Sequence, residues 1–177
     1  MKKKRVIKEL LSWIRTLAVA AVCAFVINNT LVASALVVSS SMENTIMTDS
    51  RVMGLRVAYL LSEPGRFDII LFQPPDDETS IPYVKRIIGL PGEKVEIING
   101  KVYIDDSDTP LDDSFVKETA RGNFGPYEVP EGCYFVLGDN RNGSRDSRYW
   151  DNKYVPRNSI LGRLYIEYFP SLHLLDN

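Results

Sequence analysis

An apolar segment near the N-terminus places the strongest constraint on the fold of this 177-residue chain. Residues 10–27 are mostly apolar, and the uninterrupted part, Leu17–Ile27, has 11 residues. A membrane-spanning helix needs about 20 residues. A helix over residues 6–27 would be about 33 Å long, which is enough to cross a bilayer core. The segment therefore predicts a membrane-directed helix that is separate from the folded body of the protein.

The charges around this segment leave two interpretations open. The first 15 residues carry a net charge of +5 in a chain whose total is −2, so the rest of the chain is acidic. In one interpretation the segment is a cleaved secretory signal that ends at Ala33-Ser34-Ala35. In the other it is an uncleaved anchor, with Trp13 at the membrane interface and Arg15 reaching the cytoplasmic headgroups. Both interpretations keep the basic tip in the cytoplasm and export the body.

The body is predicted to be mainly β. Asn99-Gly100 lies between two alternating runs and is the strongest hairpin signal in the chain. Residues 105–126 are rich in Asp, Ser, Thr, Gly and Pro, which predicts a loop, and a smaller lobe is expected between residues 91 and 132. Strands or short apolar runs are predicted over residues 36–38, 51–58, 67–72, 83–90, 94–98, 101–104, 133–137 and 160–169.

Ser41 and Lys85 are the candidate catalytic residues. The one histidine, His173, lies four residues from the C-terminus, so a Ser-His-Asp triad would have to form around it. A lysine can act as the base only when it is neutral, and its reference pKa is about 10.4. Burial can lower a lysine pKa by up to 3–5 units, and the apolar neighbours of Lys85 make burial plausible. If the protein is a serine hydrolase, its base is therefore a lysine.

Each of these features also has a simpler explanation. A serine and a lysine are common in a chain of this length, and Lys85 would be an ordinary surface residue on an amphipathic strand. The charged run Gly138–Trp150 would be a solvated loop instead of a hydrogen-bonded platform behind a site. Cys23 and Cys133 are not expected to form a disulfide, because one lies in the apolar segment and the other far downstream. No Cys/His cluster has the spacing of a metal site, and the acidic body argues against nucleic acid as a partner.

Taken together, the motifs and their order resemble the bacterial type I signal peptidases. The resemblance extends over the basic tip and apolar segment, Ser41-Met42, the run Tyr83–Glu93 and the run Gly138–Trp150. It implies a membrane-anchored serine endopeptidase that removes N-terminal signal peptides from exported preproteins. The implied partners are these signal peptides and membrane lipid, without cofactor, metal or nucleic acid.

The resemblance also assigns roles to residues. Ser41 is the expected nucleophile, Lys85 the general base, Ser144 the hydroxyl that orients the lysine amine, and Ser39 a donor to the oxyanion. The residues expected to support the site are Asp139, Arg141, Asp146 and Arg148, and those expected to bind substrate are Ile81, Tyr83 and Met42. The implied fold is a single transmembrane helix followed by an extracytoplasmic β-rich catalytic core with a smaller β-ribbon lobe. The implied organisation is a cytoplasmic tip over residues 1–9, an anchor over 10–32 and a catalytic domain over 33–177.

The sequence departs from the family at Asn44, where proline is usual. Proline fixes φ near −65°, so asparagine predicts a looser turn after the nucleophile. This departure keeps open a second interpretation, a signal-peptidase-like assembly factor for surface proteins that is non-catalytic or specialised. A self-cleaving Ser/Lys regulator is disfavoured, because no DNA-binding segment is present. The Ala33-Ser34-Ala35 site further predicts that an active enzyme clips its own anchor region.

Overall fold

The computed structural model describes residues 2–76 and 81–175, which fall into two compact units. The first unit, residues 1–32, contains helix α1 (Lys2–Thr30). Its segment Ile7–Thr30 is long and apolar enough to cross a membrane, and none of it is buried within the protein. The helix starts before the anchor predicted over residues 10–32 and ends two residues earlier, because strand β1 begins at Val32.

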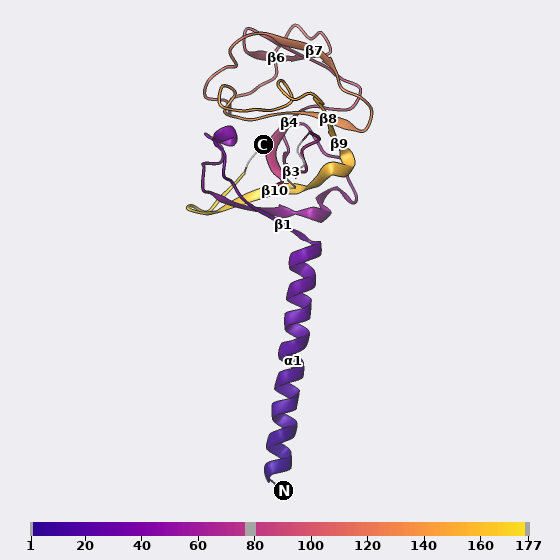
Figure 1. Cartoon of the computed structure of the whole chain (residues 1–177), viewed down its shortest axis with the longest axis vertical. Coiled ribbons are helices and arrows are strands. Elements are labelled where there is room, and N and C mark those ends of the chain that lie inside the picture. The colour runs from indigo at the N-terminus through magenta and orange to yellow at the C-terminus, as the bar shows by residue number, and fades with distance from the viewer. Residues whose placement is uncertain (1, 77–80, 176–177) are drawn as a thin grey trace. The chain divides into compact units, whose positions relative to one another are not determined.

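The second unit, residues 33–177, is built mainly from β-strands (Figure 1). Within its described part, strands pair in the order β1-β2-β10-β3-β4-β8-β9, and β11 pairs with β10. The strands of this sheet are β1 (Val32–Leu36), β2 (Arg51–Leu55), β3 (Ile69–Phe72), β4 (Tyr83–Gly89), β8 (Cys133–Leu137), β9 (Val155–Pro156), β10 (Ile160–Phe169) and β11 (His173–Leu174). The prediction of a mainly β fold after an N-terminal apolar helix is confirmed.

A smaller three-stranded sheet has the order β6-β5-β7 and is set apart from β3 and β10 (Figure 1). It consists of β5 (Lys94–Ile98), β6 (Lys101–Ile104) and β7 (Phe124–Glu128). Asn99 and Gly100 connect β5 to β6 with φ values of 49° and 79°, and Ile98 pairs with Lys101. Two positive φ values are what a two-residue hairpin turn requires. The predicted hairpin is therefore confirmed.

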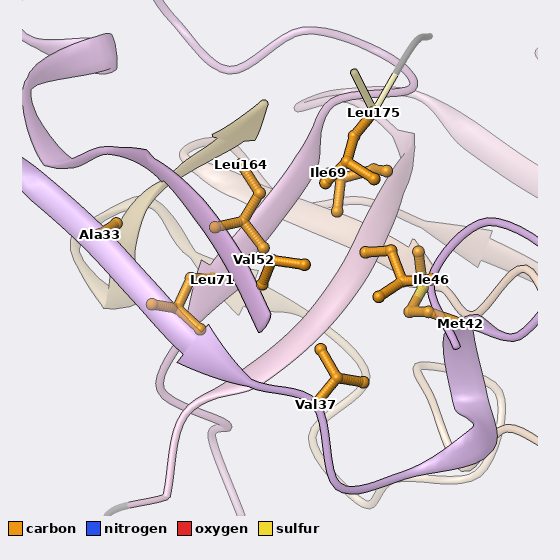
Figure 2. Packing of buried hydrophobic residues seen from close by; sticks show 9 residues of the cluster. All are labelled: Ala33, Val37, Met42, Ile46, Val52, Ile69, Leu71, Leu164 and Leu175. Atoms are coloured by element: carbon orange, nitrogen blue, oxygen red, sulfur yellow. The ribbon is translucent and has the colours of Figure 1, made fainter. Parts of the chain in front are cut away.

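Strand β3 lies in the middle of the larger sheet and is buried on both faces. Ile69 and Leu71 pack into one hydrophobic cluster, while Ile70 and Phe72 pack into a second. Burial on both faces explains why this run is continuously apolar instead of alternating. Figure 2 shows the first cluster, which is made of Ala33, Val37, Met42, Ile46, Val52, Ile69, Leu71, Leu164 and Leu175.

One strand prediction and one loop prediction are wrong in their extent. The strand expected over residues 51–58 ends at Leu55, and a 3-10 helix, Arg56–Tyr59, follows it. This turn buries Tyr59, whose hydroxyl donates a hydrogen bond of 2.8 Å to Asp68. The loop expected over residues 105–126 ends in β7, which begins at Phe124 and contains Pro126. A proline is tolerated there because β7 is an edge strand of the smaller sheet.

Candidate active site

Ser41 lies in a short 3-10 helix, Ser40–Met42, that follows β1. The side chain of Met42 anchors this helix to the core. The Met42 side chain is fully buried beside Ile46 in the first hydrophobic cluster (Figure 2). Met42 was predicted to bind substrate; in this structure its side chain points into the core and is not among the residues that line the cavity. Its buried position fixes the chain just after the candidate nucleophile.

The turn after Ser41 is closed by hydrogen bonds between backbone groups. Glu43 N donates to Ser40 O, and Thr45 N and Ile46 N donate to Met42 O, at 2.8–3.1 Å. Asn44 has a φ of 88°, a left-handed conformation that asparagine tolerates and proline cannot adopt. In this structure the turn that was expected to be loose is closed by backbone hydrogen bonds, with Asn44 in a conformation that proline would not allow.

Lys85 comes from strand β4, and its ammonium group donates a hydrogen bond of 2.6 Å to Ser41 Oγ. Only 3% of the lysine is exposed. Burial lowers its pKa to about 8, against the nearby carboxylates of Asp146 and Asp139, which raise it. The strand position is fixed by pairing of Lys85 with Ile70 of β3. The structure thus brings together the two residues singled out in the sequence, 44 positions apart, with the base near its useful pKa range.

Ser39 and Ser144 flank this pair in different ways. Ser39 Oγ lies 3.1 Å from Ser41 Oγ, within hydrogen-bonding distance. Ser144 is 6% exposed, and its hydroxyl has no hydrogen-bond partner among the described residues. The predicted bond between Ser144 and the Lys85 amine is therefore not formed here. Ser144 is nevertheless close by, because a Cβ added at Gly138 would lie 2.3 Å from both Ser144 Oγ and Ser41 O.

The run Gly138–Trp150 forms a platform of buried ion pairs instead of a solvated loop. The guanidinium of Arg86 binds both carboxylate oxygens of Asp139, at 2.9 and 2.8 Å. Arg148 binds Asp146 in the same two-bond manner, at 2.8 Å for each bond. Removing one partner of a buried pair leaves the other charge uncompensated, at a cost of about 3–5 kcal/mol. These pairs therefore hold the platform in one arrangement.

Three residues that the sequence did not single out connect this platform to its surroundings. Asn140 donates from its backbone N–H to Ser41 O at 3.1 Å and from its side chain to Ser40 O at 3.0 Å. Arg86 of β4 is the buried partner of Asp139. Asp113, in the predicted loop, accepts a hydrogen bond from Arg141 at 3.4 Å. Their roles depend on long-range pairing, so no local sequence signal could have found them.

A cavity of about 520 Å³ opens beside Ser41 and Lys85. Ile81 and Tyr83, both predicted to contact substrate, line it. Its other lining residues are Ala35, Leu36, Val37, Val38, Ser39, Pro82, Val84, Gly143 and Arg145. Most of this wall is apolar, which suits small uncharged side chains.

Other chemistries find no support among the described residues. In the ranges 2–76 and 81–175, no group of three or more His, Cys, Asp or Glu side chains could hold a metal ion. Cys23 is exposed on α1, Cys133 is half-buried in β8, and both are free thiols. His173 lies on β11 next to Glu167, away from the residues that line the cavity.

A serine hydroxyl bound to a buried lysine of lowered pKa, beside an apolar cleft in a β-sheet body, is the arrangement of a hydrolase with a Ser/Lys pair. The family model for signal peptidase, peptidase S26, matches residues 10–169. The probable signal peptidase I-2 of Synechocystis is 36% identical over 160 residues, covering 88% of this chain and 72% of that protein. The signal peptidase I of Bacillus licheniformis is 38% identical over 150 residues, covering 79% of this chain and 78% of that one.

The chain therefore belongs to the signal peptidase family, peptidase S26. With its N-terminal apolar helix, it is a membrane-anchored serine protease of that family. A solved structure of a signal peptidase I from Enterococcus faecalis V583 is 38% identical, with a TM-score of 0.48, and the match covers 59% of this chain and 98% of that one.

Proposed function

We propose that this protein is a signal peptidase I that hydrolyses one peptide bond in exported preproteins, just after the signal peptide, with Ser41 as nucleophile and Lys85 as general base. The observation that carries the proposal is the 2.6 Å hydrogen bond between Lys85 Nζ and Ser41 Oγ, buried at a peptide-sized cavity. Membership of the peptidase S26 family supports the substrate class.

The reaction follows from the two protonation states of Lys85. Neutral Lys85 accepts the hydroxyl proton while Ser41 Oγ attacks the scissile carbonyl carbon. As the tetrahedral intermediate collapses, the lysine ammonium gives this proton to the leaving amine, and an acyl-enzyme ester remains on Ser41. A water molecule, deprotonated by the neutral lysine, then releases the signal peptide and restores Ser41. Each step moves one proton between the lysine and an adjacent atom.

The oxyanion needs donors that are fixed before the reaction. The Ser41 backbone N–H and the Ser39 hydroxyl are the proposed donors, since Ser39 Oγ already lies 3.1 Å from Ser41 Oγ. One such donor is worth about 2.7–4 kcal/mol in the transition state. Ser144 is proposed to orient the lysine amine once substrate is bound. Its buried hydroxyl is free to do so, because it has no other partner within the described ranges.

Substrate is proposed to bind as an added β-strand. Strand β1 is at the edge of the sheet. Strand β4 pairs with β8 only from Arg86 onward, so its residues before Arg86 face the cavity on that side. An extended peptide between these two segments gains main-chain hydrogen bonds, while shallow apolar pockets select small side chains at the first and third residues before the cut.

The membrane arrangement completes the proposal. The basic tip is retained in the cytoplasm, α1 crosses lipid once, and the catalytic unit faces the outer side. The active site then lies at the membrane surface, where the cleavage site of a preprotein leaves the membrane. This raises the effective concentration of a membrane-bound substrate. No metal, cofactor or nucleic acid takes part.

The test is cleavage of a model preprotein by the purified protein in detergent, with the cut position read by mass. Ser41→Ala and Lys85→Ala are expected to lower the rate by about 10³-fold or more. Ser62→Ala, which removes an exposed hydroxyl elsewhere, serves as the matched control and should cut normally. Full activity of both site variants would refute the proposal. A wild-type protein that cuts nothing would favour the assembly-factor alternative.

A further inference from the structure

Arg145 is an exposed charged side chain of the active-site cavity. It lines the same cavity as Ser41 and Lys85, and its side chain is exposed. Among the described residues its guanidinium makes no hydrogen bond and no ion pair. This contrasts with Arg141 and Arg148 of the same run, which are buried and bound to carboxylates. The platform does not need Arg145, so its charge is available to a ligand.

A second cavity, of about 290 Å³, adjoins the first and shares two of its lining residues, Tyr83 and Arg145. Trp150 forms part of its wall, with its ring centroid 6.4 Å from that of Tyr83. The other described residues of the lining are Pro74, Pro75 and Asp76. This cavity is large enough for one or two amino-acid side chains and combines an apolar wall with two charges.

The side chains of Val84 and Tyr83 in β4 pack into different hydrophobic clusters. Val84 packs with the cluster that contains Val37, on the side where the apolar part of the groove lies. Tyr83 packs with Phe72 and Trp150 on the other side, and the Lys85 amine lies 5.8 Å from the Tyr83 ring centroid. Lys85 gives its proton to the leaving amine, and we assign the leaving segment of the substrate to the Tyr83 side, next to that amine. On this assignment the second cavity, which Tyr83 also lines, is on the path of the segment after the cut.

The charges along the groove agree with this division. Between Ala35 and Ser39, and between Ile81 and Val84, the lining side chains are all uncharged. Apart from the catalytic lysine, the charged lining residues in the part of the chain that the structure describes are Arg145 in both cavities and Asp76 in the smaller one. Asp76 Oδ2 already accepts a hydrogen bond of 2.8 Å from the backbone N–H of Asn152. Among the described lining residues, Arg145 is thus the charged side chain without a hydrogen bond or ion pair.

We propose that Arg145 is a specificity-determining residue that binds an acidic side chain at the first or second residue after the cleaved bond, with the cavity between Tyr83 and Trp150 as the subsite. The inference rests on the proposed function, because it requires a peptide in the groove. An Asp or Glu there gains a charge-assisted hydrogen bond with the guanidinium, whereas a Lys or Arg is repelled by it. The enzyme therefore selects on the start of the mature protein as well as on the end of the signal peptide.

The experiment compares synthetic peptides that carry one invariant signal-type cleavage site. Each peptide carries Asp or Asn at one of three positions. These are the first residue after the cleaved bond, the second residue after it, and the second residue before it. For wild-type protein at low salt, kcat/KM is expected to be about two- to fivefold higher for Asp than for Asn after the cut, as for an exposed ion pair. Raising the salt to about 0.5 M should remove most of this ratio by screening. No such ratio is expected before the cut.

Variants assign the effect to one guanidinium. Arg145→Gln should bring the Asp/Asn ratio close to one, and Arg145→Glu should invert it. Arg121→Gln makes the same change in net charge at a residue that lines neither cavity, so it should keep the wild-type ratio. Asp76→Asn should leave the ratio equal or larger, because it removes the competing negative charge.

Three outcomes overturn the inference. One is equal cleavage of the Asp and Asn peptides by wild-type protein, and another is a ratio that survives Arg145→Gln. The third is a preference seen only before the cut, which would place Arg145 on the wrong side. These outcomes leave the proposed function standing, since the peptides are cut. If no peptide is cut at all, the proposed function fails and the inference falls with it.

Discussion

An exposed lysine is almost fully protonated at neutral pH, and Lys85 differs because its environment disfavours the charged form. Burial outweighs the attraction of Asp146 and Asp139, so the pKa falls to about 8. The same burial removes competing water from the Ser41 hydroxyl. Burial of the pair therefore both lowers the pKa of the base and shields the nucleophile from water.

This pKa predicts the pH dependence of cleavage. Because only the neutral amine can accept the Ser41 proton, kcat/KM should rise about tenfold per pH unit below pH 8 and level off above it. The measurement is a pH–rate profile on a short peptide, with circular dichroism at each pH as the control for folding. A midpoint near the ordinary lysine value of 10.5 would show that burial does not act on this group.

Asn44 supports a second prediction at the residue scale. With a φ of 88°, Asn44→Pro cannot keep the observed backbone and should lower the free energy of unfolding by well over 1 kcal/mol. The displaced turn would also slow cleavage, since it follows Ser41 directly. Denaturant unfolding and peptide cleavage measure the two effects. Asn44→Gly, which tolerates positive φ, is the matched control, and equal behaviour of both variants would contradict the prediction.

At the scale of elements, β1 bears on the possibility of self-cleavage. Ala33 is fully buried in β1 and packs in the first hydrophobic cluster, and Ala35 itself lines the active-site cavity. A scissile peptide has to lie extended in the groove, and β1 is part of the wall of that groove. The structure thus argues against the self-cleavage expected at Ala33-Ser34-Ala35.

The expected outcome is an intact N-terminus after long incubation of active protein in detergent. Intact-mass measurement would detect a shorter species that begins at Leu36. Ser41→Ala protein, incubated in parallel, separates self-cleavage from a contaminating protease. A fragment that forms only with the wild-type serine would show that β1 leaves the sheet often enough to be cut.

The elements also show which parts of the structure could be foreseen from the sequence. The hairpin at Asn99-Gly100 is local, because two adjacent residues with positive φ decide it. The lowered pKa of Lys85 was foreseeable from its apolar strand neighbours. Strand β7 was missed because Pro126 reads as a loop residue, while an edge strand can tolerate it.

Other features follow only from pairing between distant segments. Arg86 meets Asp139 because β4 and β8 pair with Arg86 opposite Leu137, and a sequence pattern does not specify that register. Met42 turns inward because a 3-10 turn follows β1, although its place next to Ser41 suggested contact with substrate. The pair Ser41 and Lys85 could thus be predicted from the sequence, whereas the contacts of the residues around the pair could not.

At the scale of the whole molecule, the protein divides into an apolar helix and a β-sheet unit with its own hydrophobic core. This division separates two contributions to activity, the chemistry at Ser41 and the location of the enzyme. The chemistry depends only on residues of the second unit.

Deletion of residues 2–31 tests this separation. The shortened protein keeps β1 and the core, so its kcat/KM on a short soluble peptide should stay within a few-fold of wild type. Its rate on a vesicle-bound preprotein should fall by tenfold or more, because the effective concentration is lost. Full-length protein in the same vesicles is the control. An equal loss on both substrates would mean that the helix is needed for folding or chemistry.

The bonds that close the site span long distances along the chain. Ser41 meets its base 44 residues later, and the amide of Asn140 reaches back 100 residues to the Ser40 carbonyl. A chain that is still being made, or that has misfolded, holds only an ordinary serine and a charged lysine. Proteolytic activity therefore requires that these distant segments have come together, so a chain that is still incomplete cannot cut other chains or its own copies.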